Sequence, residues 1–126
     1  MKRLLLDTNV AVWLLLGVRD RVSTSAVEAL GDTTNDVALS AASVWEIAIK
    51  RSLGKVTLPD RWTAALQRLG FDPMPVTAVH AAAVEGLTWH HRDPFDRLLV
   101  AQASVERCAL VTADRRLAEY RVETLW

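Results

Sequence analysis

Short apolar segments alternate with helical segments along this chain, and that order limits the fold more than any other feature of the sequence. Residues 3–6 form an apolar run that ends at Asp7, and residues 9–16 follow as an apolar helix that ends at Gly17. A strand without a polar face is typical of a parallel sheet that is covered on both sides. The alternation therefore predicts an α/β fold, a three-layer sandwich in which a short, mostly parallel sheet is flanked by helices.

Apolar periodicity, capping residues and helix stops predict the remaining elements. Further strands are expected at 37–39, 110–112 and 121–125, with at best a short edge strand in the proline-containing segment 71–76. Further helices are expected at 25–30, 41–53, 59–69, 78–87, 94–106 and 115–120. Ser25 and Thr77 are the expected N-caps, and Pro94 the first residue of its helix. No linker interrupts this order, so one domain spanning 1–126 is expected.

The composition argues against several classes of protein. Hydrophobic residues make up 51% of the 126 residues, which is too many for a disordered chain. No apolar run approaches the roughly 20 residues that span a bilayer, so no membrane association is expected. Cys108 is the one cysteine, so no internal disulfide can form, and a cytoplasmic location fits best. The formal net charge is zero, so global charge gives no reason to expect nucleic-acid binding.

Four acidic residues fall where the predicted topology brings chain segments together. Asp7 and Asp114 each follow a predicted strand, and the carboxyl ends of parallel strands meet at one edge of a sheet. Glu46 lies about two turns into the helix that follows the second strand, and Asp96 lies in the first turn of another. Clustered carboxylates repel one another unless cations neutralise them or their pKa values rise. Ligands that are all oxygen favour Mg²⁺ or Mn²⁺ over zinc.

Each of these acids also has a purely structural interpretation. Asp7 and Asp114 precede predicted helices and are suitable N-caps. Ser43 and Glu46 have the spacing of a capping box, and Asp93 precedes Pro94 as a cap, with Asp96 as its partner in the first turn. Taken one at a time, these interpretations are at least as good as a metal site. The case for a site depends on all four carboxylates meeting.

Four segments match, in order, the motifs of a known family. Residues 4–9 (LLLDTN), 39–47 (LSAASVWEI), 93–103 (DPFDRLLVAQA) and 111–115 (VTADR) resemble the four motifs of PIN-domain ribonucleases. In its length and in the sequence of the third motif, the chain most resembles the VapC-type toxins of bacterial toxin–antitoxin pairs. The resemblance spans nearly the whole chain.

The resemblance implies a PIN-like fold and Mg²⁺- or Mn²⁺-dependent endonucleolytic cleavage of RNA. The catalytic and metal-binding acids would be Asp7, Glu46, Asp96 and Asp114, with Asp93 as a variable extra. Three hydroxyl residues would then orient carboxylates or water: Thr8, Ser40 and Thr112. The resemblance also implies a homodimer and a cognate VapB-type antitoxin whose C-terminal segment blocks the groove.

Other polar and aromatic residues near the motifs allow more than one interpretation. The arginines that flank the acids could contact phosphate, or could be solvated or paired with carboxylates: Arg92, Arg97, Arg115 and Arg116. The histidines lack the closely spaced cysteine and histidine partners of a zinc site. Core packing is the default for the tryptophans on the predicted helices, Trp13, Trp45 and Trp62.

Three other functions compete with the nuclease. A receiver-like signalling domain is also small and acidic at one sheet edge, but it needs a second acid after the first strand and a lysine after the last. Here Thr8 and Asn9 follow Asp7, and no lysine occurs after Lys55. A phosphatase of the haloacid dehalogenase type needs two acids spaced by one residue after the first strand, and Asn9 stands where the second acid should be. A non-catalytic PIN-like binding module stays open, although the complete set of acids argues against it.

Overall fold

Five strands form one parallel sheet in the computed structural model, which describes residues 1–126. The strands are β1 (Arg3–Leu6), β2 (Asp36–Ser40), β3 (Asp72–Met74), β4 (Ala109–Val111) and β5 (Thr124–Leu125). They lie in the order β3-β2-β1-β4-β5, and every neighbouring pair is parallel. β2 and β3 lie on one side of β1, and β4 and β5 lie on its other side, so the strand order reverses between β1 and β4. The crevice beyond the carboxyl ends of β1 and β4 is therefore the place where such sheets bind ligands.

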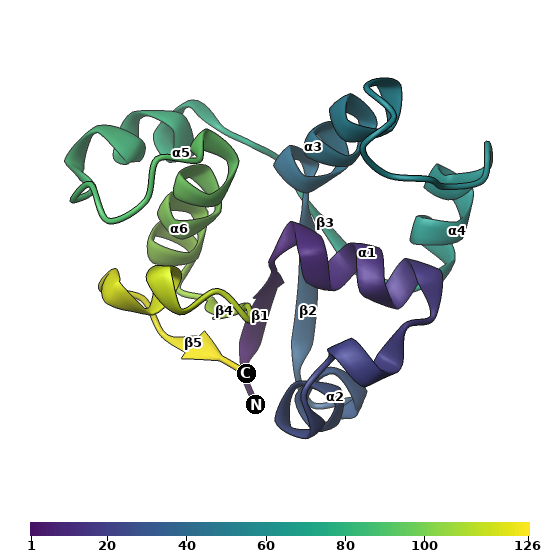
Figure 1. Ribbon diagram of the computed structural model, residues 1–126. Helices are drawn as coiled ribbons and strands as arrows, with labels where there is room; N and C mark the ends of the chain where they lie inside the picture. Colours follow the sequence, from purple (N-terminus) through teal and green to yellow (C-terminus); the bar gives the residue numbers. More distant parts are fainter.

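Helices cover both faces of this sheet. They are α1 (Thr8–Leu16), α2 (Thr24–Gly31), α3 (Ala41–Ser52), α4 (Trp62–Arg68), α5 (Ala78–Ala83) and α6 (Pro94–Glu106), with 3₁₀ turns at Arg19–Arg21, Val84–Gly86 and Arg115–Glu119. In Figure 1, α1 to α4 lie on one side of the strands and α5 and α6 on the other. The predicted three-layer α/β sandwich is confirmed. No helix is long and apolar enough to cross a membrane.

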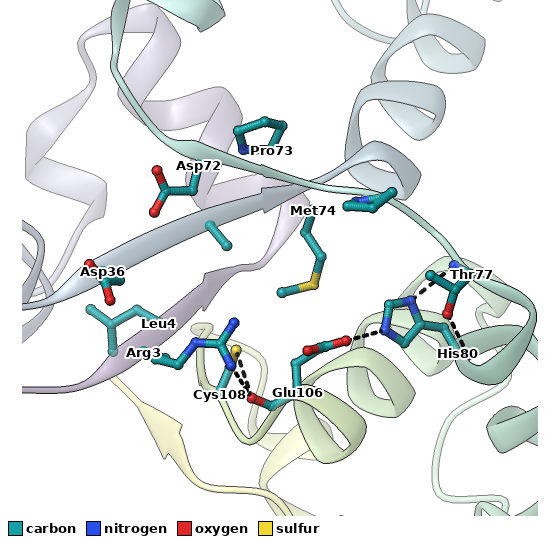
Figure 2. Close-up of a pocket in the computed structure, with 12 residues that line it drawn as sticks. Arg3, Leu4, Asp36, Asp72, Pro73, Met74, Thr77, His80, Glu106 and Cys108 are labelled. Carbon is teal, nitrogen blue, oxygen red and sulfur yellow. Dashed lines mark hydrogen bonds and ion pairs between the residues drawn. The ribbon is translucent and has the colours of Figure 1, made fainter.

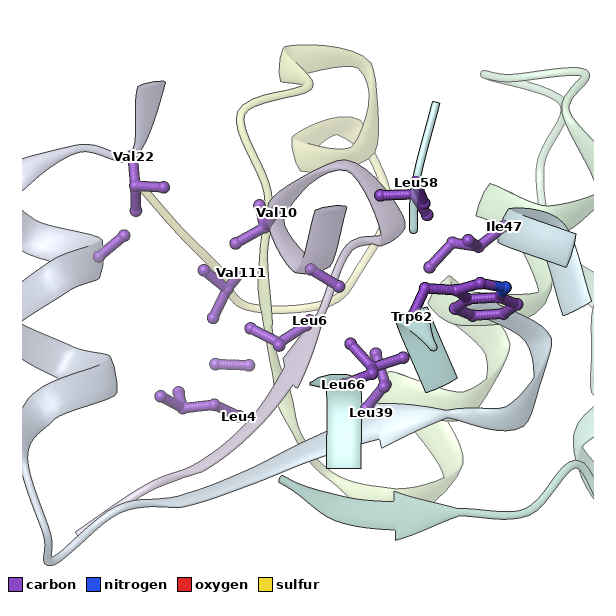
Figure 3. Close-up of a cluster of buried hydrophobic side chains, with 13 residues drawn as sticks. Leu4, Leu6, Val10, Val22, Leu39, Ile47, Leu58, Trp62, Leu66 and Val111 are labelled. Atoms are coloured by element: carbon purple, nitrogen blue, oxygen red, sulfur yellow. The ribbon is translucent and has the colours of Figure 1, made fainter. Parts of the chain in front are cut away.

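Alternation along β1 explains why this strand has no polar face. Leu4 and Leu6 belong to the apolar cluster under α1, α3 and α4, shown in Figure 3. Leu5 belongs to a second cluster on the opposite face, which it shares with Leu99 of α6. All three leucines of β1 are fully buried, and burial of each contributes roughly 1.5–3 kcal/mol. The strand that carries Asp7 is thus fixed from both sides.

Several predicted boundaries are wrong: the last strand, expected at 121–125, is formed only by Thr124–Leu125, and two helices begin at other residues than expected. The contacts of α3 explain one of the helix starts. The predicted helix 59–69 begins only at Trp62. Arg51 at the end of α3 donates to the Leu58 carbonyl at 3.2 Å and pairs with Asp60 at 2.6 Å, so residues 58–61 are held as a loop and turn before the helix. The helix predicted at 25–30 begins at Thr24, because the Ser23 hydroxyl rather than Ser25 accepts from the Ala26 amide.

The other differences lie nearer to the site. Thr77 caps α5 as expected, but the α-helix ends at Ala83 and continues only as the 3₁₀ turn Val84–Gly86. The guanidinium of Arg97 donates to the carbonyls of Val84 and Leu87 at 3.3 and 3.4 Å, and these bonds hold the chain in the 3₁₀ turn and the loop after it. The segment 71–76 holds the short edge strand β3, as predicted. The helix 94–106 is confirmed with its predicted boundaries.

Candidate metal and active site

Asp7 lies directly after β1, with its side chain almost fully buried. It occupies the N-cap position of α1, but its carboxylate makes no N-cap hydrogen bond, and within that helix only the backbone of the adjacent Thr8 lowers its pKa. Instead the Thr112 hydroxyl donates to Asp7 Oδ2 at 2.7 Å. Burial raises the pKa of Asp7, the Thr112 hydrogen bond opposes the rise, and the nearby charge of Glu46 adds to it. The capping interpretation of Asp7 is therefore wrong.

Glu46 is buried on α3, and only one of its two oxygens has a partner. Oε2 lies 2.8 Å from the ammonium of Lys50, one turn further along the helix. Oε1 is buried without any hydrogen-bond partner. A buried carboxylate oxygen without a partner carries a desolvation cost that a cation or a donor would offset. This atom is the strongest structural sign that a positive ligand belongs here.

The capping box predicted for Ser43 and Glu46 is absent. Ser40 is the N-cap of α3, and its hydroxyl accepts from the Ala42 amide at 3.0 Å. Ser43 instead accepts a hydrogen bond from the Thr8 hydroxyl at 2.9 Å, in the buried contact between α1 and α3. Neither interaction involves the Glu46 carboxylate, so the helix start gives that carboxylate no structural role.

Asp93 and Asp96 have different roles at the start of α6. Asp93 Oδ1 accepts from the amides of Phe95 and Asp96 at 2.8 and 3.3 Å, which confirms Asp93 as the cap. Asp96 faces the other acids instead. Burial, followed by the charges of the neighbouring carboxylates, raises the pKa of Asp96 to about 7; those neighbours are Asp7, Asp93, Glu46 and Asp114.

Asp114 caps the 3₁₀ turn after β4 and also faces Asp96. Its Oδ1 accepts from the Arg116 amide at 2.9 Å, and its Oδ2 lies 3.0 Å from the Arg116 guanidinium. Hydrogen bonding to Arg116 lowers the pKa of Asp114. Between Asp96 and Asp114 lies His91, and one ligand atom of each of these three residues falls within 4.8 Å of the others. The capping interpretation of Asp114 is confirmed, and it does not remove the carboxylate from the cluster.

The four predicted acids thus gather at one edge of the sheet. They come from the end of β1, from α3, from the start of α6 and from the turn after β4, and mutual repulsion contributes to the raised pKa values of Asp7 and Asp96. Apart from His91 Nε2, the atoms here that could hold a cation are hard carboxylate oxygens. Such a set fits Mg²⁺ or Mn²⁺.

The profile described as "PIN domain" matches residues 4–123. The chain belongs to the PIN-domain family. A relative named Ribonuclease VapC22, from Mycobacterium tuberculosis, is 32% identical over 124 residues and covers 96% of this chain and 94% of that protein. The four acidic positions all lie within the matched region.

Solved structures support the same fold. A crystal structure of VapBC2 from Rickettsia felis, bound to a DNA fragment from its promoter, contains a chain that matches with a TM-score of 0.74 at 17% identity, over 98% of this chain and 99% of that one. A chain of FitAcB from Neisseria gonorrhoeae matches with a TM-score of 0.54 at 19% identity, over 96% of this chain and 95% of that one. At such identities the likeness concerns the arrangement of the elements.

The hydroxyl residues expected to support the PIN-domain acids differ in what they contact. Thr112 holds Asp7, as expected. Thr8 bonds Ser43 and so acts on the packing of α1 against α3. The hydroxyl of Ser40 is used in capping α3, which does not fit the expected role of orienting a carboxylate. The expectation for Ser40 came from the family resemblance, in which the residue belongs to the second motif.

Arg97 does not fit the expected contact with phosphate, because its guanidinium is buried away from the acids. Nη1 lies within hydrogen-bond distance of the Thr88 carbonyl and the Tyr120 hydroxyl, at 3.0 and 3.2 Å. The guanidinium also stacks 3.7 Å from the centre of the Trp89 ring. Further bonds to the carbonyls of the segment 84–91 complete its coordination. Arg97 holds that segment in place, whereas Arg115 is exposed and free to meet a phosphate.

Lys50 and His91 contact the acids but were missed as site residues. Lys50 stands four residues after Glu46 on a predicted helix, and that spacing alone predicts an ion pair. His91 lies in the loop before α6, and no periodicity shows where a loop side chain points. Trp45 departs from the expected core role: it is 60% exposed, and its ring lies 5.1 Å from that of Phe95.

A cavity of about 250 Å³ lies apart from the acids, on the α6 side of the sheet. It is lined by Arg3, Asp36, Met74 and Cys108 among others (Figure 2). Its one buried histidine, His80, already has partners at both ring nitrogens. Nδ1 accepts from the Thr77 amide at 3.1 Å, and Nε2 lies 2.9 Å from Glu106 Oε1. Nothing in this cavity calls for a ligand.

The raised pKa of Asp96 predicts how stability depends on pH. The carboxyl has a pKa of about 7 in the folded PIN domain against 3.8 unfolded, so the folded state binds the proton more tightly. Asp96 therefore destabilises the metal-free protein progressively as the pH rises from about 4 to about 7. Asp96→Asn should raise the melting temperature of the metal-free protein, and more at about pH 8 than at about pH 5. Calorimetry in chelator checks this, and an equal gain at both values would contradict it.

Proposed function

We propose that this PIN domain is a metal-dependent endoribonuclease and the toxin of a type II toxin–antitoxin pair. The observation that carries the proposal is the convergence of four carboxylates around Glu46, whose Oε1 is buried without a partner. The family membership and the relative named a ribonuclease support it. The single domain expected over 1–126 is part of the same proposal.

Asp7, Glu46, Asp96 and Asp114 are the residues that we propose hold Mg²⁺ or Mn²⁺. A cation held there would lower the pKa of a bound water for attack and would offset charge on the phosphate. The protein's own groups prepare the site. Thr112 fixes the rotamer of Asp7 through a buried hydrogen bond.

Positive side chains at the margin of the site have two roles in this proposal. Lys50 and Arg116 pair with Glu46 and Asp114 and offset part of the acidic charge that would repel an RNA backbone. Arg115 lies exposed at the start of the turn after Asp114. Its side chain can contact a phosphate there without breaking an interaction that holds the fold. The groups that position RNA are therefore distinct from the buried Arg97.

The experiment that tests the nuclease is incubation of the purified protein with total RNA, with Mg²⁺, with Mn²⁺ and with chelator. Cleavage is expected only with a divalent cation and should be lost in Asp7→Asn. The matched control is Asp20→Asn, which removes an exposed acid from the turn after α1. Cleavage that survives in Asp7→Asn, or that needs no cation, would contradict the proposal.

A small VapB-type antitoxin is the partner that we propose for the nuclease. The solved relatives are described as VapBC and FitAB assemblies. An apolar hollow of about 820 Å³ lies between α3, α4 and β3 and is bordered by Trp45. An exposed apolar surface of this kind is consistent with the binding of a protein partner there. Expression of the chain alone should arrest growth, the neighbouring gene should relieve the arrest, and Asp7→Ala should abolish it. Harmless expression of folded wild-type protein would refute the toxin role and leave the nuclease standing.

The second candidate function is a binding module without catalysis. It predicts that divalent cations and RNA bind but that no phosphodiester bond is cut. The family membership and the relative named a ribonuclease favour the nuclease over such a module. The homodimer that the resemblance implies stays a prediction, which sedimentation of the purified protein tests.

A further inference from the structure

His91 occupies an unusual position between two of the proposed metal ligands. Its side chain is only 7% exposed, and its Nε2 lies 3.0 Å from Asp96 Oδ2 and 3.4 Å from Asp114 Oδ2. Yet Nε2 forms a well-aligned hydrogen bond with neither carboxylate. A buried ring nitrogen that has no aligned partner and stands beside two carboxylates is a group whose interaction is incomplete in the metal-free protein.

The backbone around His91 determines which ring nitrogen carries the proton. The Asp93 amide donates to His91 Nδ1 at 3.0 Å, so Nδ1 must present its lone pair. In the neutral ring the proton then lies on Nε2, which becomes the donor toward the acids. The Tyr120 hydroxyl accepts from the His91 amide at 3.1 Å, and Tyr120 is itself held by Arg97 at 3.2 Å. Position and tautomer are thus built into the fold.

We propose that His91 is a positioning residue whose Nε2–H holds one oxygen each of Asp96 and Asp114, so that their other oxygens are presented to the cation. This inference rests on the proposed metal-dependent function. A single donor shared between two carboxylates explains why neither hydrogen bond is well aligned before the cation is bound. The residue thereby acts on metal affinity through the two acids.

Direct coordination by His91 is the competing arrangement, since its Nε2 and the two carboxylates are close enough to surround one ion. The Asp93 amide argues against it. A metal on Nε2 normally leaves the proton on Nδ1, and a proton there would face the amide hydrogen of Asp93. Coordination would require the loop to release this hydrogen bond.

Two substitutions separate the two nitrogens of the ring. In His91→Asn the side-chain oxygen can still accept from the Asp93 amide, as in an Asx turn, but the donor toward the acids is lost. In His91→Gln the amide group can still reach the acids as a donor. His90→Gln is the matched control, because His90 pairs with Glu119 and with none of the four proposed metal ligands.

Titration calorimetry with Mn²⁺ gives the first readout. His91→Asn should bind Mn²⁺ about 10- to 100-fold more weakly, whereas His91→Gln and His90→Gln should stay close to wild type. His91→Asn should also lose RNA cleavage at low Mn²⁺ and regain it when the Mn²⁺ concentration is raised. A variant that is merely misfolded would not regain cleavage in this way. Unchanged affinity in His91→Asn would overturn the inference.

Electron spin-echo spectroscopy of bound Mn²⁺ gives a readout that needs no variant. The wild-type spectrum should lack the modulation of a directly coordinated imidazole ¹⁴N, and its presence would overturn the inference even if His91→Asn failed to fold. If wild type binds Mn²⁺ but His91→Asn binds it equally, only the role of His91 fails. If wild type binds no divalent cation, the proposed function fails together with it.

Discussion

Replacing Glu46 by Gln should reduce RNA cleavage by more than about 100-fold, since loss of groups that merely support a metal ligand already costs 10- to 100-fold. The same change should leave the metal-free protein as stable as wild type or more stable. The carboxylate is buried, one of its oxygens has no partner, and it adds to the repulsion that raises the pKa values of Asp7 and Asp96. A neutral amide removes that repulsion.

Glu28→Gln is the control for this prediction, because Glu28 is an exposed glutamate on α2 and should affect neither property. Urea unfolding in chelator and a cleavage assay in Mg²⁺ are measured on the same preparations. A clear loss of stability in Glu46→Gln with intact cleavage would return Glu46 to a structural role.

Arg97→Ala should destabilise the protein by about 3 kcal/mol or more, since each buried acceptor left without a donor costs about 1–3 kcal/mol. Truncation leaves several buried carbonyls without a donor and removes the cation that stacks on Trp89. It also releases Tyr120, which positions the His91 amide. The segment 84–91 should therefore lose its order before the rest of the chain, a loss that hydrogen exchange detects.

Arg115→Ala is the matched control for Arg97. Arg115 is exposed, so its removal should leave the free energy of unfolding unchanged while weakening RNA binding and reducing the salt dependence of that binding. Equal stability of the two variants would show that the buried arginine contributes nothing to the fold. A loss of RNA affinity confined to Arg97→Ala, with wild-type stability, would restore its expected role at phosphate.

Much of the fold and the position of the acids could be predicted because both depend on topology. Residues 4–6 are three consecutive leucines, which is why a strand covered on both faces was expected, and the parallel order then places Asp7 and Asp114 at one edge. What sequence could not decide was the use of a side chain that fits two roles. Asp114 both caps a turn and faces the site, whereas Ser40 only caps.

Helix geometry explains the misplaced arginine and tryptophan. Neighbouring residues on an α-helix point about 100° apart, so two adjacent side chains do not face the same site. Asp96 faces the acids, and Arg97 therefore turns into the segment 84–91. Glu46 is buried toward the acids, and Trp45 turns out to solvent. That geometry was available from the sequence once one residue of each pair had been assigned.

The position of His91 was beyond sequence reasoning for a different reason. It depends on a loop whose path is set by contacts from Arg97, Tyr120 and the Asp93 amide. Those residues come from α6, from the chain after the last 3₁₀ turn and from the loop itself. No local pattern records such an arrangement.

Binding of Mn²⁺ to the metal-free protein, followed as a rise in melting temperature, tests most directly whether the four acids form one cation site. Wild type should be stabilised in proportion to RT ln(1 + [Mn²⁺]/Kd), and the double variant Asp7→Asn, Asp96→Asn should show no rise. Asp20→Asn serves again as the control for an exposed acid. The same Mn²⁺-induced rise in the double variant as in wild type would place the cation elsewhere and contradict the proposed site.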